Sequence, residues 1–153
     1  MSRRSLPIGI QTFREIREGN FYYVDKTGFA LRLIDEGKYY FLSRPRRFGK
    51  SLFLDTLAEL FEGHEALFRG LEAGRCWDWS RRSPVIRLSF GGGLVRRPAE
   101  LDAKIREQLV VNQEAIGIRC AEPTLTGGLA ELIRKAHAAA GERVVVLVDE
   151  YDK

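Results

Sequence analysis

Three consecutive residues, Gly49, Lys50 and Ser51, combine side chains that suit the binding of a phosphate group. A glycine lets the backbone approach a phosphate closely, a lysine can reach the β- and γ-phosphates, and a serine hydroxyl can bind Mg²⁺. The three residues match the end of the phosphate-loop pattern G-x-x-x-x-G-K-[ST], whose first glycine is replaced by Arg44. The triplet alone is a weak signal, because it recurs by chance in many unrelated chains.

Two neighbouring acids, Asp149 and Glu150, form a second group directly after the apolar run Val144–Val148. In phosphate-loop enzymes an acid at the end of such a strand holds Mg²⁺ and its water shell. A second acid beside it is placed to act as the general base that accepts a proton from the attacking water. The loop and the acids support each other, so we predict a site for ATP and Mg²⁺ with Ser51 and Asp149 as metal ligands and Lys50 and Glu150 as catalytic residues.

The residues around the glycine extend the predicted phosphate loop. Arg44 precedes Pro45, and this order favours an extended path over the left-handed turn that demands glycine. Arg46 and Arg47 can add charge-assisted contacts to phosphate, and the alternative is that both are simply solvated. The predicted nucleotide-binding residues are Arg46, Arg47, Phe48, Gly49, Lys50, Ser51 and Leu52.

The elements that must carry these two groups alternate between strands and helices. Tyr39–Ser43 is aromatic, apolar and uncharged, which predicts a buried strand before the loop. Apolar residues at three- and four-residue steps after Lys50 predict a helix that Gly63 stops. This alternation indicates an α/β fold with a parallel sheet. The other predicted elements are a short strand or extended segment at Asn20–Gly28, a short helix before Gly37, a strand at Ser83–Phe90, helices at about Ala99–Asn112 and Leu125–Ala140, and a strand buried on both faces at Val144–Val148.

The composition is that of one globular domain spanning residues 1–153, in which we expect residues 1–8 to be flexible. No apolar run approaches the roughly 20 residues of a membrane span, and no apolar signal region follows the first arginines. We therefore expect a cytoplasmic protein with no membrane partner. Cys76 and Cys120 have no metal-type spacing and are expected to be ordinary thiols.

Four stretches of the sequence resemble one known family, the AAA-ATPase-like family, and together they run through nearly the whole chain. Many prokaryotic members carry a PD-(D/E)XK nuclease-like domain further along the chain. The Arg-Pro-Arg-Arg form of the loop is usual in that family, so the resemblance makes Arg44 a family trait. The four stretches are "YYVDKTG" at Tyr22–Gly28, "YFLSRPRRFGKSLFLDTL" at Tyr40–Leu57, "LFRGL" at Leu67–Leu71 and "VVLVDEYDK" at Val145–Lys153.

The resemblance implies a P-loop NTPase three-layer sandwich with a mostly parallel sheet. It implies the same phosphate, Mg²⁺ and water roles for the loop and the two acids that their residue types indicate. It also implies that Tyr23–Thr27 lies near the nucleotide. Within that segment Asp25 and Lys26 could equally form a structural ion pair.

The end of the sequence at Lys153 has a consequence for the expected sheet. The fold that the resemblance implies places a later strand between the loop strand and the acidic strand, and it uses later sensor residues. We therefore expect an N-terminal portion whose sheet is incomplete at its C-terminus and whose unpaired edges at Tyr39–Ser43 and Val144–Val148 favour self-association. ATP hydrolysis is expected only in a complete chain or assembly, and a nuclease-like domain there would add nucleic acid as a partner.

Two other functions fit parts of the sequence. A nucleic-acid-binding module could use the basic stretch Arg44–Lys50 against backbone phosphates, but it leaves the acidic pair unexplained. A small-molecule kinase could use the same loop, but the sequence carries no signature of an acceptor pocket or lid. The triplet Asp102-Ala103-Lys104 resembles part of a nuclease motif, and we interpret it as a solvated helical face.

Overall fold

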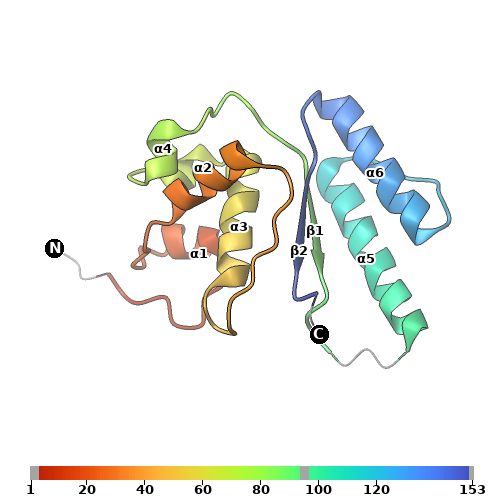
Figure 1. Cartoon of the computed structure of the whole chain (residues 1–153), viewed down its shortest axis with the longest axis horizontal. Coiled ribbons are helices and arrows are strands. Elements are labelled where there is room, and N and C mark those ends of the chain that lie inside the picture. The colour runs from red at the N-terminus through yellow and green to blue at the C-terminus, as the bar shows by residue number, and fades with distance from the viewer. Residues whose placement is uncertain (1–3, 94–96, 152–153) are drawn as a thin grey trace. The chain divides into compact units, whose positions relative to one another are not determined.

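The computed structural model describes residues 4–93 and 97–151 (Figure 1). The chain divides into two compact units, Met1–Arg81 and Arg82–Lys153, and each is described by itself. The first unit contains four helices and one 3₁₀ helix in its described part. They are α1 (Phe13–Glu18), α2 (Thr27–Glu36), α3 (Lys50–Phe61), η1 (Glu65–Phe68) and α4 (Glu72–Cys76).

The core of the first unit is aromatic and leucine-rich. Phe13 of α1 and Phe68 of η1 are fully buried, and their ring centroids lie 4.8 Å apart. Leu60 of α3 is also fully buried and belongs to the same cluster. The helix α3 forms because its apolar residues recur at three- and four-residue steps and therefore share one face. Burial of that face against α1 and η1 positions the first turn of α3.

The second unit is a small parallel α/β structure. Its strands are β1 (Val85–Ser89) and β2 (Val145–Asp149), which pair in parallel with Val85 opposite Val145 and Ser89 opposite Asp149. Parallel neighbours need a crossover, and here α5 (Pro98–Ile116) and α6 (Leu125–Ala140) supply it. Both helices lie on the same side of the sheet (Figure 1). The core between them joins Ile86 and Leu88 of β1 to Leu109 of α5 and Leu132 of α6.

Most of the predicted longer elements are confirmed. The helices at α3 and α6 and the strands at β1 and β2 form where the apolar patterns indicate, and the α/β class is confirmed as helices with a two-stranded parallel sheet. The helix α5 is longer than predicted, because Pro98 starts it and Gly117, with φ 78°, ends it in a left-handed cap. The short elements α1, η1 and α4 were not predicted.

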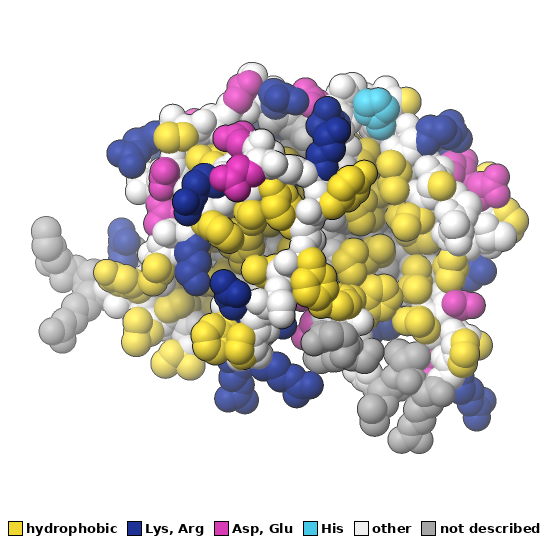
Figure 2. Space-filling model, viewed as in Figure 1, with side chains coloured by type: hydrophobic (Ala, Val, Ile, Leu, Met, Phe, Trp, Pro, Cys, Tyr) yellow, Lys and Arg dark blue, Asp and Glu magenta, His cyan; other side chains and the backbone are white. Residues whose placement is uncertain are grey.

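The strand predicted at Tyr39–Ser43 is wrong. These residues form no regular element, and the Tyr39 and Phe41 side chains are 94% and 69% exposed. A strand exists only through its ladder of hydrogen bonds, and in the described residues only β1 and β2 form a sheet. Hydrophobic side chains are visible at the surface over much of the face shown in Figure 2.

The prediction that the last strand is buried on both faces is also wrong. In β2 the side chains of Val146 and Val148 are 40% and 39% exposed, while those on the alternate positions are half-buried. Of the segment expected to be flexible, residues 1–3 lie outside the described part. Ser5 in the remainder forms a parallel bridge with Phe21.

Candidate functional site

The predicted phosphate loop lies in the first unit, directly before α3. Two of its residues have a left-handed backbone, with φ 66° at Arg47 and φ 77° at Gly49. A Cβ at position 49 would meet no atom within 4 Å, so the backbone angle, and not crowding, requires glycine there. Arg47 is not a glycine, and a non-glycine residue with a left-handed backbone is uncommon and is found mainly at turns and ligand sites.

The N-terminus of α3 is open. Its first helical hydrogen bond runs from the Phe53 N–H to the Gly49 carbonyl oxygen over 3.0 Å, and no side chain of the described residues caps this end. The N–H groups of a first helical turn have no partner inside the helix, and they carry the positive end of the helix dipole. Because Lys50 and Ser51 lie in this turn, the helix start has the chemistry of a phosphate site.

The loop side chains differ in their exposure. Arg46, Arg47 and Phe48 are exposed, and the Phe48 ring is 64% accessible. Lys50, Ser51 and Leu52 are half-buried at the start of α3. Among the predicted binding residues, therefore, those before α3 are exposed and those in its first turn are half-buried. Arg44, just before them, donates from Nη1 to the carbonyl oxygen of Ser43 over 3.1 Å.

Two acids of α3 anchor this helix to α1. The Asp55 Oδ2 accepts a hydrogen bond of 2.6 Å from the Phe13 N–H, which lies at the start of α1. The Glu59 Oε2 accepts one of 2.9 Å from Arg14 Nη2, and the Glu59 side chain is only 7% exposed. The helix that carries Lys50 is therefore fixed by a cap and an ion pair as well as by its apolar face.

The segment Tyr23–Thr27 contains side chains that hydrogen-bond to the starts of two helices. The Asp25 Oδ1 accepts hydrogen bonds from the Thr27 N–H and hydroxyl, at 2.9 and 2.6 Å, and Oδ2 accepts one of 2.8 Å from the Glu72 N–H. The buried Thr27 hydroxyl oxygen accepts a further bond from Ala73 N–H over 3.0 Å. These contacts join the starts of α2 and α4. They give Asp25 a role as a cap in place of the suggested ion pair with Lys26.

The acidic pair lies in the second unit, at the end of β2. Asp149 is the last strand residue, and its Oδ1 accepts a hydrogen bond of 2.9 Å from the Glu150 N–H. Glu150 turns the chain with φ 53°, a left-handed value, and its carboxylate lies against the backbone of Gly91. Both acids are half-buried. The end of β2 therefore carries two neighbouring carboxylates, that of Asp149 on the last strand residue and that of Glu150 on the turn residue after it.

The predicted site residues thus form two groups. Arg46–Leu52 lies in the first unit, and Asp149 and Glu150 lie in the second. The structure describes the geometry of each group within its own unit. Their assembly into one nucleotide site is part of the proposal below.

A third cluster joins Glu59, Glu62 and His64, whose ligand atoms all lie within 4.8 Å of one another. Arg14 already neutralises Glu59, and His64 Nδ1 lies 2.5 Å from the same carboxylate oxygen. The Arg14–Glu59 ion pair and the hydrogen bond of His64 to Glu59 therefore account for this cluster at the end of α3.

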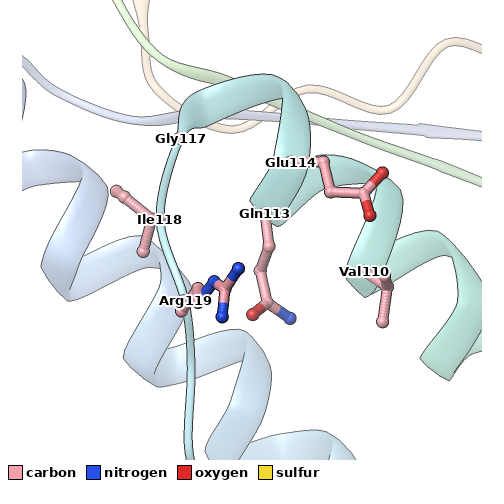
Figure 3. Close-up of a pocket in the computed structure, with 6 residues that line it drawn as sticks. All are labelled: Val110, Gln113, Glu114, Gly117, Ile118 and Arg119. Atoms are coloured by element: carbon pink, nitrogen blue, oxygen red, sulfur yellow. The ribbon is translucent and has the colours of Figure 1, made fainter.

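The surface hollow drawn in Figure 3 lies far along the chain from these groups. It is formed by the end of α5 and the segment after it, with Gln113 and Arg119 among its walls. The residues that line it in the described part of the chain are Val110, Gln113, Glu114, Gly117, Ile118 and Arg119. The hollow therefore includes none of the predicted site residues.

Sequence reasoning missed residues that hold the two groups in place. Asp55 and Glu59 of α3 were not singled out in the sequence, and their partners Phe13 and Arg14 belong to the short helix α1, which was not predicted. Lys104 was interpreted as part of a solvated face, but it is half-buried and donates from Nζ to the carbonyl oxygens of Gly91 and Gly92. The signal available in the sequence was the repeat of polar residues at Lys104, Gln108 and Asn112 along α5.

A glycine–lysine–serine loop at a helix start and an acidic pair at the end of a parallel strand are features typical of nucleotide-binding proteins with a phosphate loop. Residues 7–153 match the AAA-ATPase-like family, described as "Predicted AAA-ATPase". The chain belongs to this family.

A curated relative is 67% identical over 154 residues, described as an uncharacterized protein in the vnfD 5′ region of Azotobacter chroococcum mcd 1. The match covers 100% of this chain and 30% of the relative, so the chain spans less than a third of that protein's length. No solved structure matches the chain. Among the described residues, no helix has the length and apolar character needed to cross a membrane.

Proposed function

We propose that this chain is the nucleotide-binding part of a Mg²⁺-dependent ATPase. The observation that carries the proposal is the loop itself, where a left-handed Gly49 leads into the open N-terminus of α3 with Lys50 and Ser51 in its first turn. Membership of the AAA-ATPase-like family supports nucleotide binding in general. The wider P-loop sandwich, in which one domain of residues 1–153 brings the loop and the acidic strand together, belongs to the same proposal.

In this proposal the helix start binds the phosphates. The N–H groups after Gly49 donate to phosphate oxygens, and the Lys50 ammonium pairs with the β- and γ-phosphates. Arg46 and Arg47 add positive charge from the exposed side of the loop, and Phe48 and Leu52 flank the phosphate contacts. The affinity comes from many N–H donors that the fold orients before the ligand arrives.

The donor set fits Mg²⁺. The ion prefers oxygen ligands and keeps several waters, and Ser51 offers a hydroxyl oxygen while Asp149 offers a carboxylate. Asp149 already accepts the Glu150 N–H on one oxygen, which orients the carboxylate at the strand end. Bound Mg²⁺ would supply neutralisation of the charge that develops on the phosphate oxygens.

Glu150 is the proposed general base. A water attacks the γ-phosphorus and gives its proton to the Glu150 carboxylate, while the bond between the γ-phosphorus and the bridging oxygen breaks and ADP leaves. Lys50 stabilises the charge on the departing phosphates. This step requires the two units to bring Lys50 and Glu150 to one nucleotide, which we propose for a complete chain or assembly.

The test is the binding of a fluorescent ATP analogue with Mg²⁺ to the chain and to Lys50→Ala. We expect Lys50→Ala to weaken binding by about tenfold to a hundredfold, because a charge-assisted hydrogen bond is worth roughly 1.5–3 kcal/mol. Lys38→Ala removes the same charge from an exposed position in the same unit and should bind like the parent. Equal binding by Lys50→Ala and the parent would show that the loop is not the nucleotide site.

A second candidate function is the binding of nucleic acid, and the exposure of Arg44, Arg46 and Arg47 supports it. Such binding would weaken steeply with salt, because each phosphate contact releases a counterion. It would also be indifferent to Mg²⁺-ATP and to Lys50→Ala if the arginines alone made the contacts. Measurement of oligonucleotide affinity at two salt concentrations, with and without Mg²⁺-ATP, separates the two functions.

A further inference from the structure

A polar stripe on α5 follows the outer edge of β1. Lys104, Gln108 and Asn112 are spaced four residues apart, which places them on one face of the helix about 6 Å from each other. Every second residue of a strand turns its N–H and C=O to the same edge, at intervals of about 6.6 Å. The two spacings match closely enough for each side chain of the stripe to reach one backbone position of β1 or of the turn after it.

The contacts confirm this match. The Asn112 side chain accepts from the Arg87 N–H at 2.8 Å and donates to the Arg87 carbonyl oxygen at 2.9 Å. The Gln108 side chain does the same with Ser89, at 2.6 and 2.9 Å. Two amide side chains therefore take the place of a neighbouring strand. Lys104, one turn earlier, continues the stripe beyond the strand.

Lys104 holds the turn after β1. Its ammonium donates to the carbonyl oxygen of Gly91 and, over 3.0 Å, to that of Gly92. The Gly91 N–H donates to the Ser89 hydroxyl oxygen over 3.3 Å. Because the Phe90 N–H donates to the Asp149 carbonyl oxygen over 3.0 Å, pairing with the acidic strand continues up to this turn.

The Glu150 carboxylate occupies the space that a side chain at position 91 would need. A Cβ built on Gly91 would overlap the Glu150 Oε2. Position 91 therefore requires glycine because any side chain there would collide with the Glu150 carboxylate. This requirement differs from that of the two glycines that follow, Gly92 and Gly93, which have φ 83° and 91° and no atom within 4 Å of a Cβ.

We propose that Gly91 and Lys104 are positioning residues for Glu150. Lys104 fixes the Gly91 carbonyl from the α5 side. The Glu150 carboxylate, at the end of β2, packs against the Gly91 backbone, and this contact surface is called the Gly91 shelf. The left-handed turn at Glu150 directs its side chain there. The inference rests on the proposed function for its catalytic meaning, because Glu150 is the proposed general base, but the arrangement itself can be measured without catalysis.

The test of position uses NMR on the full chain with ¹³C-labelled glutamate carboxyl groups. The Glu150 signal is assigned as the one that Glu150→Gln removes. We expect Gly91→Ala to move this signal by more than the spread of the other glutamate signals, because a Cβ must push the carboxylate off the shelf. Lys104→Met, which keeps most of the side-chain stem, should move it in a separate variant without adding any atom at position 91.

The matched control is Gly128→Ala, in α6 of the same unit, where a Cβ would make ordinary contacts of 3.7 and 3.8 Å. This control should leave the Glu150 signal in place. The proposal is overturned if neither Gly91→Ala nor Lys104→Met moves the signal, or if Gly128→Ala moves it as far.

The test of catalytic meaning measures kcat and ATP affinity for the same variants in the complete protein or its assembly, for which turnover is proposed. We expect Lys104→Met to lower kcat by about tenfold to a hundredfold with ATP affinity changed less than about twofold, because only the base is displaced. Lys104→Arg, which keeps the donors, should recover much of kcat. In a Glu150→Gln background Lys104→Met should cost nothing further.

These outcomes separate the two proposals. Normal turnover by Glu150→Gln removes the general base from the proposed function and leaves the NMR result to decide the position. A displaced Glu150 signal with an unchanged kcat overturns the catalytic half of this inference alone. A complete protein that binds Mg²⁺-ATP without turnover likewise overturns the catalytic half of this inference.

Discussion

At the scale of single residues, Asp25 shows how one carboxylate joins two helices of the first unit. Burial raises the pKa of Asp25, but hydrogen bonds from the Thr27 hydroxyl and N–H and from the Glu72 N–H outweigh it, so the pKa lies below its ordinary value of 3.8. Each of these donors favours the ionised form. The charged carboxylate is therefore the form that the folded unit selects.

We expect Asp25→Asn to destabilise the chain by about 1–2 kcal/mol at pH 7, in the range of a lost helix cap. A lowered folded pKa gives stability that is present above the unfolded pKa and is lost as the pH falls through the folded pKa. The difference from the parent should therefore shrink as the pH falls below about 3.8. Thermal unfolding at pH 7 and pH 3 measures it, with the exposed Asp35→Asn of α2 as control.

A difference between parent and Asp25→Asn that stays constant between these two pH values would contradict the ionised cap.

The residue types near the phosphate loop predicted the helix after it but not the backbone before it. The predicted helix starts at Lys50, because its apolar pattern depends on residues close to each other in sequence, whereas the left-handed angle of Gly49 was not predicted. The role of Asp25 was not predictable, since its partner Glu72 lies in a short helix with no periodic pattern of its own. The shelf at Gly91 was missed for the same reason, because it depends on a carboxylate from the far end of the chain.

At the scale of elements, the polar stripe on α5 stabilises β1, one of the two strands that form the sheet in the described residues. The amides of Gln108 and Asn112 satisfy backbone groups of β1 that a third strand would otherwise pair. Asn112 is only 6% exposed. Loss of its amide would leave the backbone groups of Arg87 without these partners.

We expect Asn112→Ala to lower the free energy of unfolding by roughly 1–3 kcal/mol, because part-buried backbone groups of Arg87 lose the hydrogen bonds of the Asn112 amide. Glu107→Ala changes an exposed residue of the same helix and should alter stability by less than about 0.5 kcal/mol. Urea unfolding measures both, and the urea midpoint should fall while the slope m stays constant. An Asn112→Ala midpoint equal to that of Glu107→Ala would show that the stripe contributes no stability.

Longer elements followed their sequence patterns, and Tyr39–Ser43 did not. The helices α3 and α6 bury one face each, so a periodic pattern was sufficient to predict them. The strands β1 and β2 pair in parallel because α5 and α6 between them return the chain to the same end of the sheet. Tyr39–Ser43 has the composition of a strand, but a strand also requires a partner, and composition does not report whether one is present.

At the scale of the whole molecule, the sheet has two different edges. The outer edge of β1 is covered by the α5 stripe. On β2, the Val145 N–H donates to the Pro84 carbonyl oxygen and the Asp149 carbonyl oxygen accepts from the Phe90 N–H, so the odd-numbered positions face β1. The backbone groups of Val146 and Val148 therefore face the other edge, which carries no strand in the described residues.

We expect this edge of β2 to make the chain self-associate as its concentration rises, because a strand edge that pairs with no strand of the described residues can pair with a second chain. Val146→Lys should reduce the association, since a charged side chain on an edge strand opposes pairing. Val111→Lys, at an exposed position of α5 that is 63% accessible, adds the same charge elsewhere and should associate like the parent. Sedimentation velocity over a hundredfold range of concentration measures the effect. A parent that stays monomeric throughout, or equal protection by both lysine variants, would exclude the β2 edge as the contact.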